Sequence, residues 1–288
     1  MHNHIIDSIR KIKQLPPPSG LSREIVRIVA DDQVDLIDLV SIINKSPAIT
    51  ARILRCANSA YYGQRGEIST VREAIIRVLG LGITRSLALA MALTSSFNIK
   101  KSAGFDAERY WFNAVTTATI AQGLSHFLRI RVKPAPATAY TTGLIHNIGL
   151  QALVHCFPEQ METVFLQKDN NSSLSDLIHD ELSINHHQAS AILAQSWDLP
   201  EEIIQAMASL DNSIDLDENA PLVHLVWLSS QISDNLYRNQ NGPLQGLSIN
   251  DEFISMDHVQ KVISDIEGKL EGLHELSQLI TNGGGGNS

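Results

Sequence analysis

The most informative segment of the chain reads Leu144-Ile145-His146-Asn147-Ile148-Gly149. Its apolar residues predict a buried helix, and His146 and Asn147 place two polar side chains inside it. A His-Asp doublet is a common ligand pair for divalent metal ions, and here an asparagine stands in the place of the aspartate. A carboxylate brings charge and a choice of oxygens to a cation, whereas an amide brings one neutral oxygen and is a weaker ligand. The function therefore depends on whether the chain is a metal-dependent hydrolase or has kept only the shell of one.

The composition predicts a globular protein with an aliphatic core. Of the 288 residues, 43% are hydrophobic and 18% are charged, which is too apolar for a disordered chain and sufficient for one large domain or two modest ones. The formal net charge is -9. Non-specific nucleic-acid binding needs a positive surface, so it is disfavoured as the main role. The basic clusters at residues 10–13 and 129–133 are short, and we interpret them as solvated surface.

Several features predict a cytoplasmic protein without a membrane segment. Cys56 and Cys156 lie far apart in apolar surroundings, where cysteine commonly acts as a small buried hydrophobe. Residues 1–7 lack a basic region followed by an apolar core, so they do not resemble a secretory leader. Residues 134–158 lack acidic and basic side chains but contain prolines and polar residues, which favours a buried helix over a membrane span.

Helical signals dominate and strand-like alternation is scarce, so we expect an all-α fold. Ser46 followed by Pro47 predicts a helix start, and Thr70 with Glu73 forms a capping-box pattern at another. Further expected elements are a break at Gly80 and Gly82, helices over residues 84–97 and 106–127, a helix that carries His146 and stops before Pro158, helices that start near Ser173, His186, Pro200 and Pro221, and a last helix over residues 252–280.

Spacing reduces the number of histidines that could share a metal ion. His155 lies nine positions after His146 on the same expected helix, which turns it to the opposite side. The adjacent His186 and His187 are not expected to face one site together on a regular helix. His146 differs from most of the others because it lies with Asn147 inside the fold. A hydrogen bond to a neighbouring helix explains that pair as well as a ligand site does.

Several long motifs carry a family resemblance. They are Leu15-Pro16-Pro17-Pro18, residues 49–63 with Cys56-Ala57-Asn58-Ser59-Ala60-Tyr61-Tyr62-Gly63 at their end, residues 68–80, Tyr110-Trp111-Phe112-Asn113, residues 143–149, His186, and Trp197-Asp198-Leu199-Pro200. Through these motifs the chain resembles, over roughly residues 13–230, the HDOD family, a bacterial branch of the HD-domain phosphohydrolase superfamily. The resemblance implies a two-lobed helical protein. Its expected parts are an N-terminal lobe over residues 1–100, an HD-like helical lobe over residues 101–240, and a C-terminal helical extension over residues 241–288 that ends in a flexible glycine-rich tail.

The resemblance also implies a degenerate metal site. Active HD enzymes hold a divalent ion with a histidine, a His-Asp doublet and a later aspartate, and the ion activates a water that attacks a phosphate ester. The early histidine position falls on Asn113, the doublet on His146 and Asn147, and the late aspartate on Trp227. His146 and His186 are then the weak candidates for metal binding, and we predict no catalytic residue and no cofactor.

Two groups of residues are therefore candidates for function. Asn113, His146, Asn147, His186 and Trp227 are expected to line a residual pocket, which either serves packing alone or holds an anion or nucleotide without cleaving it. A second group follows a helix end and forms either an ordinary turn or a contact surface between lobes or for a partner; its members are Asn58, Ser59, Tyr61 and Tyr62.

The functional expectation is a non-catalytic signal-transduction or regulatory module that binds a signalling protein partner or a small ligand. The alternative is a divergent metal-dependent phosphohydrolase that acts on a nucleotide or phosphodiester. The residues leave the oligomeric state open.

Overall fold

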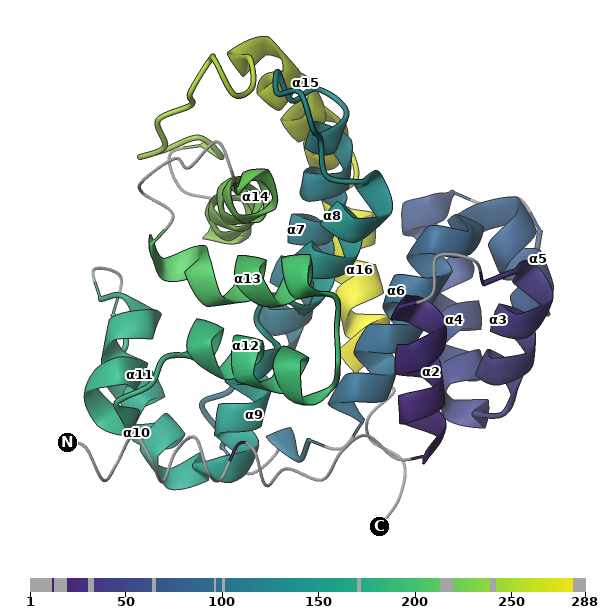
Figure 1. The fold of residues 1–288 in the computed structure, drawn as a ribbon, viewed down its shortest axis with the longest axis horizontal. Helices are drawn as coiled ribbons and strands as arrows, with labels where there is room; N and C mark the ends of the chain where they lie inside the picture. The colour runs from purple at the N-terminus through teal and green to yellow at the C-terminus, as the bar shows by residue number, and fades with distance from the viewer. Residues whose placement is uncertain are drawn as a thin grey trace.

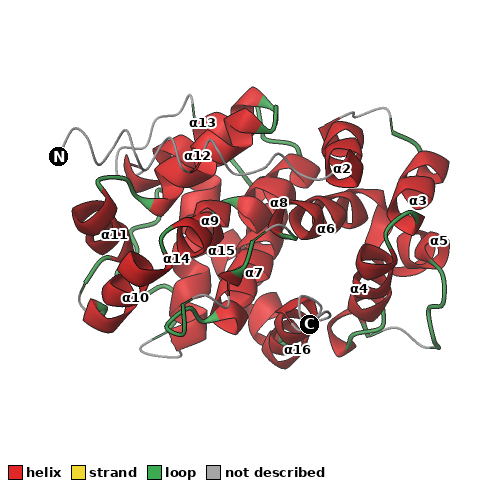
Figure 2. Ribbon diagram, turned by 90° about the horizontal axis from the view of Figure 1, so that it is seen from below, coloured by secondary structure: helices red, strands yellow, loops and turns green. Residues whose placement is uncertain are grey.

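The fold is known from a computed structural model that describes residues 12, 20–30, 34–63, 66–95, 97–99, 102–169, 172–212, 220–238 and 242–281. The expectations for the basic cluster at residues 10–13, the proline run at residues 15–18 and the glycine-rich tail lie outside the described residues. Every regular element among the described residues is a helix (Figure 2), which confirms the all-α class.

The first group of helices lies on one side of the molecule (Figure 1). It consists of α2 (Gly20–Ala30), α3 (Leu36–Asn44), α4 (Pro47–Ala57), the 3-10 turn η1 (Ala60–Tyr62), α5 (Val71–Ala74), the π-helical turn η2 (Ile75–Leu79) and α6 (Gly80–Thr94). Two predicted helix starts are confirmed. The Ser46 hydroxyl accepts a hydrogen bond from the Ile49 amide at 3.3 Å, and Thr70 and Glu73 cap each other's backbone amides.

The predicted break near Gly80 is present only as a local change of backbone conformation, because α5, η2 and α6 follow one another without a gap. Gly80 has a φ of +73°, a left-handed conformation that glycine adopts without strain. The next helix, α6, then begins at Gly80 itself rather than at Thr84, and it ends at Thr94 rather than near Phe97. Gly82 lies within α6, where its nearest neighbour across the packing is the Ala137 side chain.

The second group of helices surrounds α7. It consists of α7 (Ala107–Ser125), α8 (Pro136–Ile145), α9 (Ile148–Cys156), α10 (Pro158–Gln167), α11 (Leu174–Leu182), α12 (His186–Ser196), α13 (Glu201–Ser209), η4 (Leu210–Asn212), α14 (Pro221–Arg238), α15 (Met256–Glu267) and α16 (Leu270–Thr281). Most of α7 is buried, because α8, α14, α15 and α16 all pack against it. The helix α6 contacts both α2 and α8, so it joins the two groups.

Two predictions of single long helices are wrong. The helix expected to carry His146 is divided into α8 and α9 at His146 and Asn147. The helix expected over residues 252–280 is divided into α15 and α16 at Gly268 and Lys269. Glycine loses the most conformational entropy in a helix, so Gly268 is a signal for the second break. The first break has no glycine or proline at its centre, and packing of the flanking segments explains it.

One apolar stretch has the length and composition of a membrane span. The continuous helical segment Val71–Thr94 is the one part of the described chain that is long and apolar enough to cross a membrane, and 56% of its most apolar window is buried inside the fold. A core helix passes the same test, and the contacts of α6 with α2 and α8 place it in the core. Residues 134–158, the other apolar stretch, contain the buried helices α8 and α9.

The last helix connects the two groups (Figure 1, yellow). On one side of α16, the Glu275 carboxylate accepts a hydrogen bond from the Ala60 amide at 3.0 Å. On the other side, the His274 ring stacks on Phe112 of α7 at a centroid distance of 4.3 Å. A Cβ built on Gly272 would lie 2.8 Å from the Tyr61 Cα. The backbones of α16 and η1 are therefore in direct contact, and the segment assigned to a C-terminal extension packs against both groups.

We predict that Gly272→Ala lowers the free energy of unfolding by about 1–3 kcal/mol, because the added methyl group meets backbone rather than a movable side chain. Urea denaturation measures the change. The matched control is Gly268→Ala, since Gly268 has a φ of -66° and its added Cβ would have no neighbour nearer than 3.6 Å. That control should be neutral or stabilising by up to about 1 kcal/mol. Equal behaviour of the two variants would contradict the close contact.

Candidate functional site

Two glycines set the position of His146 and Asn147. A Cβ on Gly143 would lie 2.7 Å from the Ala118 Cα on α7. A Cβ on Gly149 would overlap the backbone of α12 at the His186 carbonyl and the Ser190 amide. The Gly149 amide also donates a hydrogen bond to the Ser190 hydroxyl at 2.8 Å. The chain between the two glycines is thus held against α7 at one end and against α12 at the other.

His146 is buried and neutral. Its side chain is 1% exposed, and its Nδ1 lies 2.7 Å from the Gly143 carbonyl oxygen. Because a carbonyl can only accept, Nδ1 carries the proton and Nε2 is left with a lone pair. Burial, followed by the neighbouring His187, lowers the pKa of His146 to about 4. The imidazole is therefore uncharged at neutral pH.

His186 and His187 begin α12, and both line the same cavity as His146. Their ring centroids are 4.0 Å apart, and the His187 ring lies 6.5 Å from that of His146. The expectation that two adjacent histidines cannot share a site is wrong here, because the cavity surrounds the end of the helix rather than one of its faces. Burial lowers the pKa of His187 to about 4. Burial and then the other two imidazoles lower the pKa of His186 well below its ordinary value.

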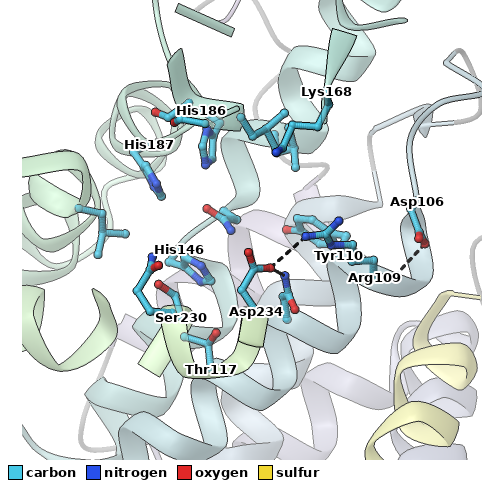
Figure 3. A pocket seen from close by; sticks show the side chains of 18 of the residues that line it. Asp106, Arg109, Tyr110, Thr117, His146, Lys168, His186, His187, Ser230 and Asp234 are labelled. Carbon is cyan, nitrogen blue, oxygen red and sulfur yellow. Dashed lines mark hydrogen bonds and ion pairs between the residues drawn. The ribbon is translucent and has the colours of Figure 1, made fainter. Parts of the chain in front are cut away.

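The structure brings the whole predicted pocket group together. Asn113, His146, Asn147, His186 and Trp227 all line one cavity of about 590 Å³, in a size range typical of small-molecule sites. Figure 3 shows side chains from several helices pointing into this space, with His186 and His187 on one side and Lys168 and Arg109 on another. The cavity is a fact of the fold, whereas a ligand for it remains a prediction.

The charged lining of the cavity was missed in the sequence. Asp234 on α14 accepts hydrogen bonds from the Asn113 amide at 2.8 Å, from Arg109 at 3.2 Å and from Arg238 at 3.0 Å. A signal for it was available, because Asp234 lies about two helical turns after Trp227 and therefore on the same face of α14. Arg109 likewise lies about one turn before Asn113 on α7.

The residues after α4 have local structural roles. The Asn58 side chain donates to the Ile68 carbonyl and accepts from the Ile68 amide, each at 2.8 Å, so it closes the loop between α4 and α5. The Ser59 hydroxyl is buried and donates to the Cys56 carbonyl. Tyr61 lies against α16, and Tyr62 packs edge-to-face on Tyr61. Tyr61 thus contributes to the contact between the two groups of helices, and a role in binding a partner stays a prediction.

The side chains of the cavity do not fit a divalent metal ion. Across the described ranges, no group of three or more His, Cys, Asp and Glu side chains is placed to hold one. The positions of two expected ligands carry amides, Asn113 and Asn147. The nearby Asp234 carboxylate is already bonded to two guanidinium groups, which supply its counter-charge.

The fold and the cavity define an all-α protein with an HD-like helical fold. The sequence model of the HDOD domain matches residues 15–213. Because that match covers well over half of the chain, the protein belongs to the HDOD domain family.

Solved structures with this fold cover nearly all of the chain. The "Putative signal transduction protein" of Marinobacter aquaeolei superimposes with a TM-score of 0.80 at 22% identity, over 97% of this chain and 65% of that one. The "Putative phosphohydrolase" of Shewanella amazonensis gives 0.73 at 22% identity, over 95% and 97%. An HDOD domain protein of unknown function from Geobacter sulfurreducens gives 0.71 at 16% identity, over 97% and 99%. At these identities the similarity shows the fold alone.

Among curated proteins, an uncharacterized protein of Treponema pallidum is 28% identical over 204 residues. The aligned region is 70% of this chain but 38% of that relative. The chain is thus much shorter than this relative, and it also spans less than two thirds of the M. aquaeolei structure.

The three cavity histidines should make stability depend on pH. Their pKa values in the folded state lie below the ordinary 6.5, so the unfolded chain binds more protons between about pH 6.5 and about pH 4. The stabilisation is complete above about pH 6.5 and is lost as the pH falls toward 4. The loss is at most about 3 kcal/mol for each of His146 and His187. Urea denaturation across this range measures it.

The variant His187→Gln should flatten this pH dependence. His126→Gln, which changes an exposed histidine, should leave it as in the wild type. The same slope in wild type and His187→Gln would show that His187 is not buried in its neutral form.

Proposed function

We propose that this chain is a non-catalytic signal-transduction or regulatory module whose cavity binds a small ligand without hydrolysing it. The single observation that carries the proposal is the bonding of Asp234 to Arg109, Arg238 and Asn113. A metal-dependent hydrolase needs carboxylates free to bind a cation. Here the Asp234 carboxylate is already paired with two guanidinium groups, which are permanently charged.

The lining of the cavity also supports a binding role. The cavity has polar walls, and several of its buried polar atoms have no hydrogen-bond partner among the described residues; they include Asn147 Oδ1, His186 Nδ1 and His187 Nδ1. A site that served packing alone would be expected to pair such groups, because each unpaired one costs about 1–3 kcal/mol. We therefore prefer a ligand cavity to packing alone.

We propose a signalling protein partner in the cytoplasm, with no nucleic acid as partner because of the acidic charge of the chain. One structure of similar fold is named as a signal transduction protein and others as phosphohydrolases. These names agree with a fold used in more than one way.

A divergent metal-dependent phosphohydrolase is the second candidate. It is favoured by His146, whose unprotonated Nε2 and bonded Nδ1 resemble a metal-binding histidine. His187 also lies close to the Asp211 carboxylate, at 3.6 Å. Two or three neutral imidazoles without a free carboxylate favour borderline ions such as zinc or nickel and bind magnesium or manganese poorly.

Metal content and turnover separate the two candidates. We predict that the protein, dialysed without chelator, holds metal well below one equivalent and does not hydrolyse a panel of phosphodiesters and nucleotides with added magnesium, manganese or nickel. The measurements are elemental analysis and product detection by chromatography. The control pair is His146→Ala and His126→Ala, which change a cavity residue and an exposed residue. Stoichiometric metal together with turnover that is lost in His146→Ala and kept in His126→Ala would overturn the proposed function.

A further inference from the structure

One side of the cavity carries three cations. Arg109 lies in the first turns of α7 and Arg238 in the last turn of α14, while Lys168 follows α10. All three line the cavity, and Figure 3 shows Arg109 and Lys168 reaching toward it near Asp234. Three cationic side chains from three separate segments thus converge on one space.

The carboxylates near these three cations do not fully neutralise their charge. Asp234 takes one hydrogen bond from each guanidinium, and a guanidinium has five N–H groups. The Lys168 ammonium donates to the carbonyl oxygens of Asp169 and Ser172, which are neutral. Burial lowers the pKa of Lys168, and the neighbouring Arg238 and Arg109 lower it further, while the carboxylates of Asp169 and Asp234 act in the opposite direction.

The other carboxylates that line the cavity have partners elsewhere. Asp106 accepts from the Arg109 amide at 2.9 Å, as the cap of α7, and from the Tyr237 hydroxyl at 3.4 Å. Asp211 accepts from the Ser175 hydroxyl and from the Asn185 amide, beside His187. Neither carboxylate is bonded to Lys168 among these contacts. On the side of the three cations, Arg109, Arg238 and Lys168 carry three positive charges and Asp234 and Asp169 carry two negative ones, so that one positive charge is left in excess.

Helix ends of both signs border the cavity, because the C-terminal ends of α10 and α14 carry Lys168 and Arg238 there while α7 and α11 begin beside it. The cavity is bordered by residues at the start of α7, including Asp106, and by residues 172–175 at the start of α11. The N-terminal end of a helix carries a partial positive charge and favours anions. A separate indication of a ligand lies at the opposite side of the cavity, where His186 is 7% exposed and its Nδ1 has no hydrogen-bond partner in the part of the chain that the structure describes.

The opposite side needs hydrogen-bond donors. Asn147 Oδ1 is an acceptor and has no hydrogen-bond partner within the described ranges. His146 Nε2 is an acceptor because Nδ1 holds the proton. Hydroxyl or amino groups are the complement of such atoms. The cavity thus combines an anion-binding side with a side that accepts hydrogen bonds.

We propose that the cavity binds a small organic phosphate, with the phosphate group between Arg109, Arg238 and Lys168 and the hydroxyl or amino groups of its body on Asn147 and the imidazoles. This inference rests on the proposed function, since it assigns the ligand class of the same cavity. A phosphate monoester suits the site better than a carboxylate does, because it brings nearly two negative charges and three acceptor oxygens to three cations.

Isothermal titration tests the proposal with two defined probes, ribose 5-phosphate and adenosine 5′-monophosphate, alongside ribose, adenosine and inorganic phosphate. We expect at least one organic phosphate to bind, and to bind at least about tenfold more tightly than either its unphosphorylated body or inorganic phosphate. The affinity should fall as the salt concentration rises. Failure of both organic phosphates to bind at millimolar concentration would overturn the proposal.

Variants locate the phosphate. Lys168→Gln should weaken binding at least about tenfold, because a charge-assisted hydrogen bond is lost. The matched control is Lys45→Gln, which removes another lysine, one that pairs with Glu24 on the surface. Asn147→Leu, which removes an acceptor, should weaken the organic phosphate but leave inorganic phosphate unchanged. Equal affinities in Lys168→Gln and wild type would refute the assigned phosphate position.

The same samples separate this inference from the proposed function. Binding of adenosine 5′-monophosphate followed by its hydrolysis, with loss of turnover in His146→Ala, would keep the ligand class and overturn the non-catalytic role. Absence of both binding and turnover would overturn the ligand class and leave the non-catalytic role intact.

Discussion

The direct contact between the backbones of α9 and α12 at Gly149 is the constraint on which the rest of the site depends. No side chain larger than hydrogen fits between Gly149 and the His186 carbonyl. With the two helices this close, the first turn of α12 lies beside the break between α8 and α9. His186 and His187 therefore meet His146 and Asn147 in one cavity. Gly143 has the same effect on α7, which brings Asn113 into range.

The electrostatics of the cavity depend on which groups neutralise its acidic side chains. In a metal enzyme a bound cation neutralises the acidic side chains around it. Here Arg109 and Arg238 neutralise Asp234 and are part of the chain itself. A carboxylate already held in this way adds little affinity for a divalent ion. The charge of Asp234 is thus balanced by two side chains of the protein itself.

Much of the fold could be predicted from the sequence because its signals are local. Ser46, Thr70, Asp106 and Ser173 each cap the helix that their position predicted. The break at His146 and Asn147 has no such local signal, since it results from packing of the segments on either side. The predicted number of helices was therefore wrong there, although the prediction that the segment is helical and buried was correct.

The candidate site shows the same division. The five pocket residues predicted from the family resemblance all line one cavity. His187 was rejected on a rule for regular helix faces, which does not apply at a helix end. Asp234 and Arg238 lie beyond the aligned motifs, and Lys168 lies on a connecting segment. The packing of α7, α10 and α14 decides which of these charged side chains lie close together. That packing cannot be derived from a single sequence.

The position of α14 has a practical consequence for anyone who works with this family. The HDOD match ends at residue 213, yet α14 contributes Trp227, Asp234 and Arg238 to the cavity wall and packs along α7. A fragment cut at the boundary of the match would expose the apolar flank of α7 to water and would leave Arg109 without its acidic partner. Two proteins that score alike over the matched region can also differ in the charges that their last helices bring to the cavity, so sorting them by ligand requires the sequence beyond that boundary.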